Sequence, residues 1–245
     1  MNKTLINGWW MSTDTRLGPY TIQVGQPVTN EQMHNAYKLK AWCDSQGWSL
    51  SATCGMIGNA IHESTLSPAF IQATNRSRLP NSAANLADVP NSVMINFYKE
   101  YYNDPNRDYG IGLVQWDGYT STAPAGQKLV SFCERYGLNW YDGDSQTRRL
   151  KAEYDNDLQF KHLEVFGVVW TWYNYVINTR TPEESADIWM NNYESPRGGL
   201  SEREGNARWF YDWFTLHPTP PFMLPNWLLF KFKRKKELRN AKWKS

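Results

Sequence analysis

A single carboxylic acid interrupts a predicted apolar helix face. The face is formed, at spacings of four, four and three residues, by Ala52, Met56, Ala60 and Glu63. These spacings place the side chains on one side of a helix that we expect to begin near residues 49–51. A buried glutamate without a partner is rare in proteins. Glu63 is therefore the first candidate for a functional group.

Cleavage of a glycosidic bond is the chemistry that such a glutamate could do. It requires a carboxylic acid that stays protonated near neutral pH and protonates the leaving oxygen. The negative end of the helix dipole and the loss of water on an apolar face should both raise the pKa of Glu63. The alternative is that Glu63 forms a cap or an ion pair inside a helix bundle.

A second carboxylate could activate water or stabilise the positively charged transition state. The candidates are Asp88, Asp104, Asp108 and Asp117. Asp117 is our preferred candidate because it directly follows Trp116 at the end of an apolar segment. A surface aspartate in a turn before Gly118 would explain the same residue equally well.

Cysteine and metal chemistry are disfavoured by spacing. Cys54 and His62 would lie about 12 Å apart along one helix, whereas Cys–His enzymes bring the two residues together from separate elements. No metal-ligand spacing is formed by His34, His62, His162 and His217. The three cysteines are scattered, so we expect buried thiols and no disulfide framework. We expect neither a metal ion nor an organic cofactor.

The order of predicted elements indicates an α+β fold that is mostly helical with one small β region. Capping boxes predict helix starts at Thr29, Thr181 and Ser201. Further helices are expected over about 122–137, 144–155 and 158–178. Strand-like segments are expected at 20–24 and 109–116, with a short strand or helical turn at 93–98. The irregular stretch 64–108 is long enough to suggest a functional loop.

Four segments follow from this pattern. We expect residues 1–28 to form an N-terminal extension or hairpin, 29–216 a catalytic domain, 217–225 a proline-rich linker and 226–245 an apolar and basic tail. No apolar run approaches the roughly 20 residues of a membrane-spanning helix. The N-terminus also lacks a long apolar region, so we expect no conventional signal peptide.

Three segments together resemble the phage tail lysozyme family. Residues 57–68, IGNAIHESTLSP, are similar to its GN…ES…NP signature, of which the ES…P part recurs in goose-type lysozymes and soluble lytic transglycosylases. Residues 109–116, YGIGLVQW, resemble the second motif, with its Gly-Leu-x-Gln core. Residues 193–196, YESP, with Arg203 and Ala207 downstream, are similar to the aromatic-Glu-x-Pro…Arg…Ala close.

The resemblance implies a lysozyme-like α+β fold with a glycan cleft between lobes and Glu63 as the general acid. Gln115 and Trp116 would line the cleft wall, with Tyr109 nearby. A side-chain amide can bind an N-acetyl group, and an aromatic ring can cover a sugar face, although Trp116 could equally be a core residue. The implied substrate is the β-1,4 glycan of bacterial peptidoglycan, cut between N-acetylmuramic acid and N-acetylglucosamine.

Several alternatives stay open at this level. Lytic transglycosylases need no second carboxylate, because the N-acetyl group of the substrate can assist, so hydrolysis and transglycosylation are not separated. The protein could also be an inactive structural or glycan-binding tail component. Delivery by a virion, as the genome enters the cell, and release as an endolysin both fit the absence of a signal peptide. Glu194 is expected to form a structural ion pair with Arg203.

Charge is distributed unevenly along the chain. Residues 231–245 contain eight Lys or Arg and one Glu, a net charge of +7, which leaves 18 basic and 23 acidic residues, or −5, in 1–230. The tail could dock on a protein of a tail assembly, lie on an anionic membrane surface or bind anionic wall polymers. A solvated, disordered terminus is the simplest alternative. We expect no nucleic-acid partner.

Overall fold

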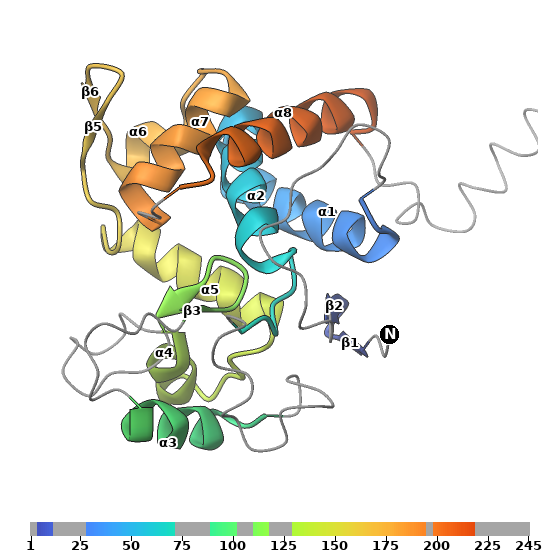
Figure 1. Ribbon diagram of the computed structural model, residues 1–245, viewed down its shortest axis with the longest axis vertical. Coiled ribbons are helices and arrows are strands. Elements are labelled where there is room, and N and C mark those ends of the chain that lie inside the picture. The colour runs from blue at the N-terminus through green and yellow to red at the C-terminus, as the bar shows by residue number, and fades with distance from the viewer. Residues whose placement is uncertain are drawn as a thin grey trace, which may run out of the picture. The chain divides into compact units, whose positions relative to one another are not determined.

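The computed structural model describes residues 4–11, 28–71, 89–101, 110–117, 129–194 and 198–218 (Figure 1). The chain divides into two compact units, residues 1–211 and 212–245. The described part is mostly helical with three small two-stranded antiparallel sheets, which confirms the predicted α+β class. None of the helices in the described ranges is long and apolar enough to cross a membrane.

The first two helices of the unit formed by residues 1–211 are both capped at their N-termini. Helix α1 (Asn30–Ser45) is capped by Thr29, whose hydroxyl accepts a hydrogen bond from the Gln32 backbone N–H, while Gln32 Oε1 accepts one from the Thr29 backbone N–H. This confirms the first capping box. Helix α2 (Leu50–Ser64) is capped by Ser49, as predicted. Nearly every side chain of α2 is buried, so this helix lies in the centre of the core.

Close packing around α2 depends on two glycines. A Cβ atom at Gly55 would lie 2.6 Å from the backbone of Ser185 in helix α7 (Pro182–Trp189). A Cβ atom at Gly58 would lie 2.7 Å from backbone atoms of helix α8 (Leu200–Leu216). Such distances are shorter than van der Waals contact, so only glycine lets both helices approach α2 this closely.

The segment from α7 to α8 supplies one side of the site. Helix α7 begins at the predicted capping box of Thr181 and Glu184 and continues into η3 (Met190–Glu194), a turn of π-helix. The predicted cap at Ser201 is wrong, because α8 already begins at Leu200. The Ser201 hydroxyl instead donates to the neighbouring Glu202 carboxylate.

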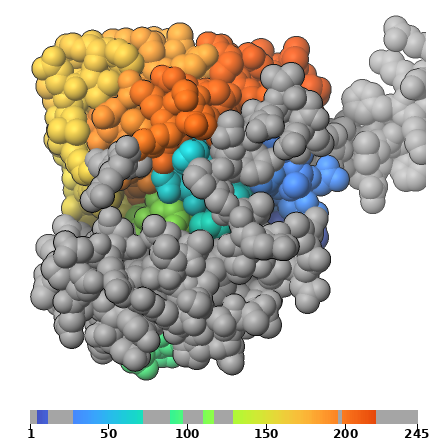
Figure 2. Space-filling model, in the orientation of Figure 1, coloured from blue at the N-terminus to red at the C-terminus, as the bar shows by residue number. Residues whose placement is uncertain are grey.

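A tight hairpin replaces the single strand that was predicted over 109–116. Strands β3 (Gly110–Ile111) and β4 (Trp116–Asp117) pair with each other, and residues 112–115 form the turn between them. Ser64 Oγ, at the end of α2, donates to the Leu113 carbonyl at 2.7 Å. In the space-filling view, the end of α2 and the residues after it (cyan) accordingly lie beside the hairpin (green) at the surface (Figure 2).

Within the described residues, one helix directly precedes this hairpin in the sequence and two follow it. They are α3 (Asn91–Tyr101), α4 (Leu129–Arg135) and α5 (Gly143–Asp155). The short strand or turn expected at 93–98 is thus a helix. Within the helix predicted over 122–137, the described residues are helical only from 129 to 135.

The long helix predicted over 158–178 is wrong. Its residues form strands β5 (Glu164–Val165) and β6 (Val168–Val169), followed by the short helix α6 (Trp172–Val176). Phe166 and Gly167 both adopt positive φ, at 55° and 71°. Two such residues between β-branched strands make a tight hairpin turn, which a helix cannot accommodate. The aromatic residues of this segment lie before β5 (Phe160), in the hairpin turn (Phe166), after β6 (Trp170) and in α6 (Trp172, Tyr173 and Tyr175).

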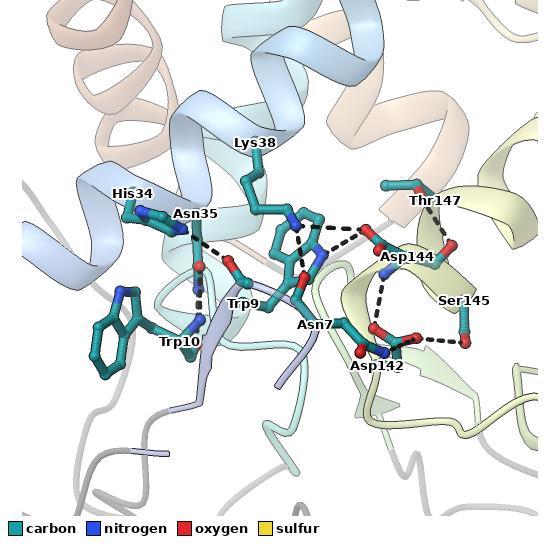
Figure 3. Close-up of polar contacts among 11 residues, drawn as sticks. Asn7, Trp9, Trp10, His34, Asn35, Lys38, Asp142, Asp144, Ser145 and Thr147 are labelled. Carbon is teal, nitrogen blue, oxygen red and sulfur yellow. Dashed lines mark hydrogen bonds and ion pairs between the residues drawn. The ribbon is translucent and has the colours of Figure 1, made fainter. Parts of the chain in front are cut away.

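An N-terminal hairpin packs against the helices (Figure 3). Strands β1 (Thr4–Ile6) and β2 (Trp9–Met11) pair across an Asn7–Gly8 turn with φ values of 49° and 76°. Asn-Gly is the strongest short hairpin signal, and this turn gives the hairpin that was one alternative for residues 1–28. The strand expected at 20–24 lies outside the described residues.

Trp9 anchors this hairpin in the core. Its ring is 1% exposed, and its Nε1 donates to Asp144 Oδ1 at 2.7 Å in the first turn of α5. A Cβ atom at Gly143 would lie 2.2 Å from the ring, so the indole occupies the space above that glycine. Asn35 of α1 donates to the Trp10 carbonyl at 2.7 Å (Figure 3). The hairpin therefore joins α1 to the start of α5.

The cysteines are core residues. Cys43, Cys54 and Cys133 are buried and free, as predicted. Burial raises the pKa of the Cys133 thiol to about 12. Such thiols are not reactive nucleophiles. Across the parts of the chain that the structure describes, no group of three or more His, Cys, Asp or Glu side chains could hold a metal ion.

Candidate active site

Glu63 occupies the last turn of the central helix α2. The helix ends because Thr65 and Leu66 both adopt left-handed backbone conformations, with φ of 56° and 61°. A left-handed β-branched residue is unusual, so the Thr65 backbone is under strain directly beside Glu63. The Glu63 side chain is 21% exposed. It therefore ends an apolar helix face, as predicted, and remains accessible to solvent.

Arg203 holds the Glu63 carboxylate. Its side chain is 2% exposed; Nη1 donates to Asn59 Oδ1 at 2.8 Å, and Nη2 donates to Glu63 Oε1. The expectation of an unpaired Glu63 in an apolar pocket is therefore wrong. The predicted pairing of Arg203 with Glu194 is also revised, because Glu63 is the carboxylate that Arg203 binds directly. The reason is that α8 crosses α2 at Gly58, which brings Arg203 over the end of α2.

Asn59 is in turn fixed from two sides. Its Nδ2 donates to the Gly55 carbonyl at 2.8 Å and to the Ala186 carbonyl of α7 at 3.1 Å. Its Oδ1 is thereby left to accept from Arg203. The three side chains form a chain of hydrogen bonds from α7 through Asn59 and Arg203 to Glu63, which fixes the orientation of the Glu63 carboxylate.

Glu194 brings a second carboxyl group to this cluster. It is the last residue of η3, and Trp189 Nε1 donates to its Oε1 at 3.0 Å. Burial and the negative charge of Glu63 raise the pKa of Glu194 to about 8, against the opposing effect of Arg203. A pKa raised to this extent is unusual for a glutamate.

The β3–β4 turn lies next to the end of α2. The Leu113 amide donates to Gln146 Oε1 of α5 at 2.9 Å, and the Leu113 carbonyl accepts from Ser64. Gln115 closes the turn at a φ of 48°, and its Nε2 donates to the Gly112 carbonyl at 3.0 Å. The first two sequence motifs are thus in direct contact, and Gln115 is partly buried within the turn.

Trp116 lies in the core. Its side chain is 3% exposed, and Nε1 donates to Glu153 Oε1 at 3.2 Å. Tyr193 also donates to Glu153, at 2.5 Å, and Arg149 Nε does so at 2.7 Å. Burial raises the pKa of Glu153, while Arg149 opposes the shift. Trp116 and Tyr193, from the second and third motifs, therefore both donate to the same buried carboxylate. Trp116 is thus a core residue, which was the alternative to its place in the cleft wall.

The other predicted site residues are less fully described. Tyr109 lies outside the described residues, as do Asp88, Asp104 and Asp108. Asp117 is the last residue of β4, where its backbone pairs with Gly110, but its side chain is not among those described. The second carboxylate of the sequence analysis therefore stays a prediction.

Sequence reasoning did not assign functional roles to three buried polar residues. Asn59 belonged to the GN part of the first motif but received no role of its own. Glu153 follows Arg149 by four residues, a spacing that predicts an ion pair on a helix but not its complete burial. Glu194 was given a structural role. In each case the partner lies on another element, so local patterns carried no signal for the contact.

The fold and the site define a lysozyme-like protein. A glutamate ends the buried central helix, a tight β-hairpin turn lies beside it, and a mostly helical α+β frame holds both. In agreement, a family model described as phage tail lysozyme matches residues 34–214, and the chain belongs to this family.

A curated phage protein is similar in sequence to this chain. Morphogenesis protein 1 of Bacillus phage B103 is 28% identical over 182 residues, which cover 74% of this chain and 39% of the relative. The chain thus spans about two fifths of the length of that relative.

Proposed function

We propose that this protein is a muramidase that cleaves the glycan strand of bacterial peptidoglycan, with Glu63 as the residue that protonates the leaving oxygen. The observation that carries the proposal is the position of Glu63. Its side chain lies at the end of a buried helix, is bound by Arg203, which Asn59 in turn holds in place, and is still 21% exposed. A fixed carboxyl within reach of a ligand is the first requirement of acid-assisted glycosidic cleavage.

The remaining roles follow from the geometry around Glu63. Arg203 and Asn59 orient the carboxyl, and the β3–β4 turn beside it offers Gln115 as a polar contact for an N-acetyl group. Asp117 remains our candidate for the group that activates water. Trp116 and Glu153 hold the β-hairpin against the third motif from within the core. No step of this chemistry uses Cys54, whose side chain is buried.

Zymography on purified peptidoglycan tests the proposal. Glu63→Gln removes the acid but preserves the size of the side chain, so we expect a folded protein with no lytic activity. Glu164→Gln, an exposed glutamate of β5, is the matched control and should clear peptidoglycan like the wild type. A Glu63→Gln variant that lyses normally would sink the proposal. Mass spectrometry of the products then separates hydrolysis, which leaves a reducing muramic acid end, from transglycosylation, which leaves an anhydro end.

A lysozyme-like structural or glycan-binding protein without activity is the second candidate. The ion pair between Arg203 and Glu63 favours it, because a carboxylate held by a guanidinium is typical of a structural role. The same zymogram decides between the two. A folded wild-type protein that binds peptidoglycan without cleaving it would establish the second candidate.

The biological role that we propose is that of a lysin carried in the phage virion, at the tail, which opens the host wall as the genome enters the cell. Support comes from the phage tail lysozyme family and from a relative described as a phage morphogenesis protein. Release as an endolysin is the alternative. Detection of the protein in purified virions by mass spectrometry would support the first role, and its absence from virions would support the second.

A further inference from the structure

A buried side-chain amide of α5 contacts the first two sequence motifs at once. Gln146 is fully buried, and its Oε1 accepts from the Leu113 N–H in the β3–β4 turn at 2.9 Å. Its Nε2 donates to the Pro68 carbonyl at 2.8 Å and to the Trp140 carbonyl, which precedes α5, at 2.7 Å. One side chain therefore joins the segment that follows α2 to the turn of the hairpin.

These contacts fix the orientation of the Gln146 amide. Its two N–H groups face two carbonyl oxygens, and its oxygen faces an N–H group. The opposite orientation would set the amide nitrogen against the Leu113 N–H and the amide oxygen against both carbonyls. In a fully buried position no water can compensate such contacts, and each unmade hydrogen bond is costly. Gln146 is therefore locked in one arrangement.

The β3–β4 turn is held from both sides of Leu113. The Leu113 N–H donates to Gln146, and the Leu113 carbonyl accepts from Ser64 Oγ at the end of α2. The Gly112 N–H donates to the Phe70 carbonyl at 2.8 Å. Gly112 has a φ of 81°, and a Cβ atom there would lie 2.9 Å from Gln146 Oε1, so glycine lets the amide lie against the turn. Successive peptide groups of the turn are thus fixed relative to α2.

We infer that Gln146 is a positioning residue of the site, whose amide sets the β3–β4 turn against the end of α2 so that Gln115 contacts the glycan that Glu63 cleaves. The inference rests on the proposed glycosidase function. Gln146 is fully buried, so it acts through the turn and does not touch the substrate itself. Glu63 is held separately by Arg203. Loss of the Gln146 contacts should therefore impair substrate binding more than proton transfer.

Gln146→Met tests the inference, because methionine has a similar size but cannot make these hydrogen bonds. We expect KM for soluble glycan strands of peptidoglycan to rise about tenfold and kcat to stay within about threefold of the wild type, the pattern of lost substrate binding. The matched control is Asn178→Leu, which removes another buried amide that binds backbone groups, between α6 and α7, and should leave KM unchanged. An equal rise of KM in both variants, or a fall of kcat at unchanged KM, would overturn the inference.

Ligand binding without cleavage provides a second measurement. In the Glu63→Gln background, calorimetry with the same glycan strands should show binding weakened about tenfold by Gln146→Met. Gln146→Glu keeps an oxygen that accepts from Leu113, so it should recover most of this loss. Unchanged binding in Gln146→Met, or failure of both Gln146 variants to fold, would overturn the inference and leave Gln146 a core residue. A wild type that binds the strands without cleaving them would instead refute the proposed function, so the two failures are distinguishable.

Discussion

At the scale of single residues, Arg203 sets the position of the Glu63 carboxyl, the group from which the site was predicted. Arg203 connects Asn59, fixed between α2 and α7, with Glu63. A guanidinium can bind two acceptors with separate nitrogens in a fixed plane, whereas an ammonium group cannot reproduce that geometry. The position of the Glu63 carboxyl is therefore set by the shape of Arg203 as well as by its charge.

Arg203→Lys tests this dependence. The variant keeps the charge but loses the fork, so we expect turnover of peptidoglycan to fall about 100-fold through misplacement of Glu63. Arg208→Lys on the same helix is the control, because its ion pair with Glu183 is partly exposed. Turbidity loss of purified wall suspensions measures both. Equal rates for the two variants would contradict a positioning role for Arg203.

The raised pKa of Glu194 predicts a pH-dependent stability. Between its ordinary value of 4.5 and about 8, folded Glu194 keeps its proton while the unfolded chain releases it. Its contribution is fully present below pH 4.5 and is lost as the pH rises through this window, by at most about 1.4 kcal/mol per pH unit. Relative to wild type, Glu194→Gln should therefore gain stability from pH 5 to pH 8. Urea unfolding at both pH values measures this, and a constant difference would contradict it.

At the scale of elements, helix α2 is positioned by the small residues on its surface. Gly55 and Gly58 allow α7 and α8 to approach it closely, and this approach brings Arg203 to Glu63. The π-helical turn η3 then carries Glu194 into the same cluster. A glycine in a helix costs about 1 kcal/mol relative to alanine, so both positions serve packing at some expense to helix stability.

Gly58→Ala should disturb both packing and catalysis. The added methyl group would lie 2.7 Å from the Ala207 amide nitrogen and the Arg203 carbonyl of α8, so the helices must separate. We expect a loss of about 1–3 kcal/mol in the free energy of unfolding and reduced lytic activity. In the control, Gly205→Ala on α8, the new Cβ atom meets nothing within 4 Å. That control should be neutral or slightly stabilising, and a matching loss in both variants would refute the packing argument.

The N-terminal hairpin packs on the start of α5 through the Trp9 ring, which lies over Gly143. Gly143→Ala would place a methyl group 2.2 Å from the Trp9 ring and should be clearly destabilising. Trp9→Ala should cost about 3–5 kcal/mol. In the double variant the methyl group has room, so Gly143→Ala should cost far less than in the wild type. Thermal unfolding of the four proteins gives the coupling energy, and simple additivity would show that the ring and the glycine do not compete for space.

At the scale of the whole molecule, the chain combines a body and a tail of opposite charge. Its two compact units divide after residue 211, and the basic residues 231–245 belong to the second. The proposed functions of the two differ, cleavage for the body and attachment for the tail. The predicted boundaries at 29, 217 and 226 remain predictions, and the tail, residues 226–245, lies outside the described residues.

Removal of residues 218–245 should separate these functions. We expect the shortened protein to cleave purified peptidoglycan within about twofold of the wild-type rate, because all residues proposed for cleavage precede the cut. Its attachment to partner or surface should be lost, and in the full chain that attachment should weaken with salt. Pull-down from virion extracts and turbidity assays measure the two properties. Loss of cleavage on truncation would contradict the division.

The sequence by itself determined the features that depend on residues close together along the chain. Capping at Thr29 and Thr181, the apolar face that ends at Glu63, and the burial of the cysteines all follow from local spacing and polarity. The family motifs also identified the fold before its elements were placed. The misplaced helix over 158–178 shows the limit of this reasoning, because an aromatic-rich segment can be buried equally well by a hairpin and a short helix.

Only the tertiary structure decided the electrostatics of the site. Arg203 lies 140 residues after Glu63, and nothing in the sequence between them says which carboxylate it binds. The partner of Trp116 proved to be Glu153, and the pKa of Glu194 proved to be raised by burial and by the charge of Glu63. Charge interactions and desolvation depend on distance and burial in space, and these are set by how helices cross at residues such as Gly58.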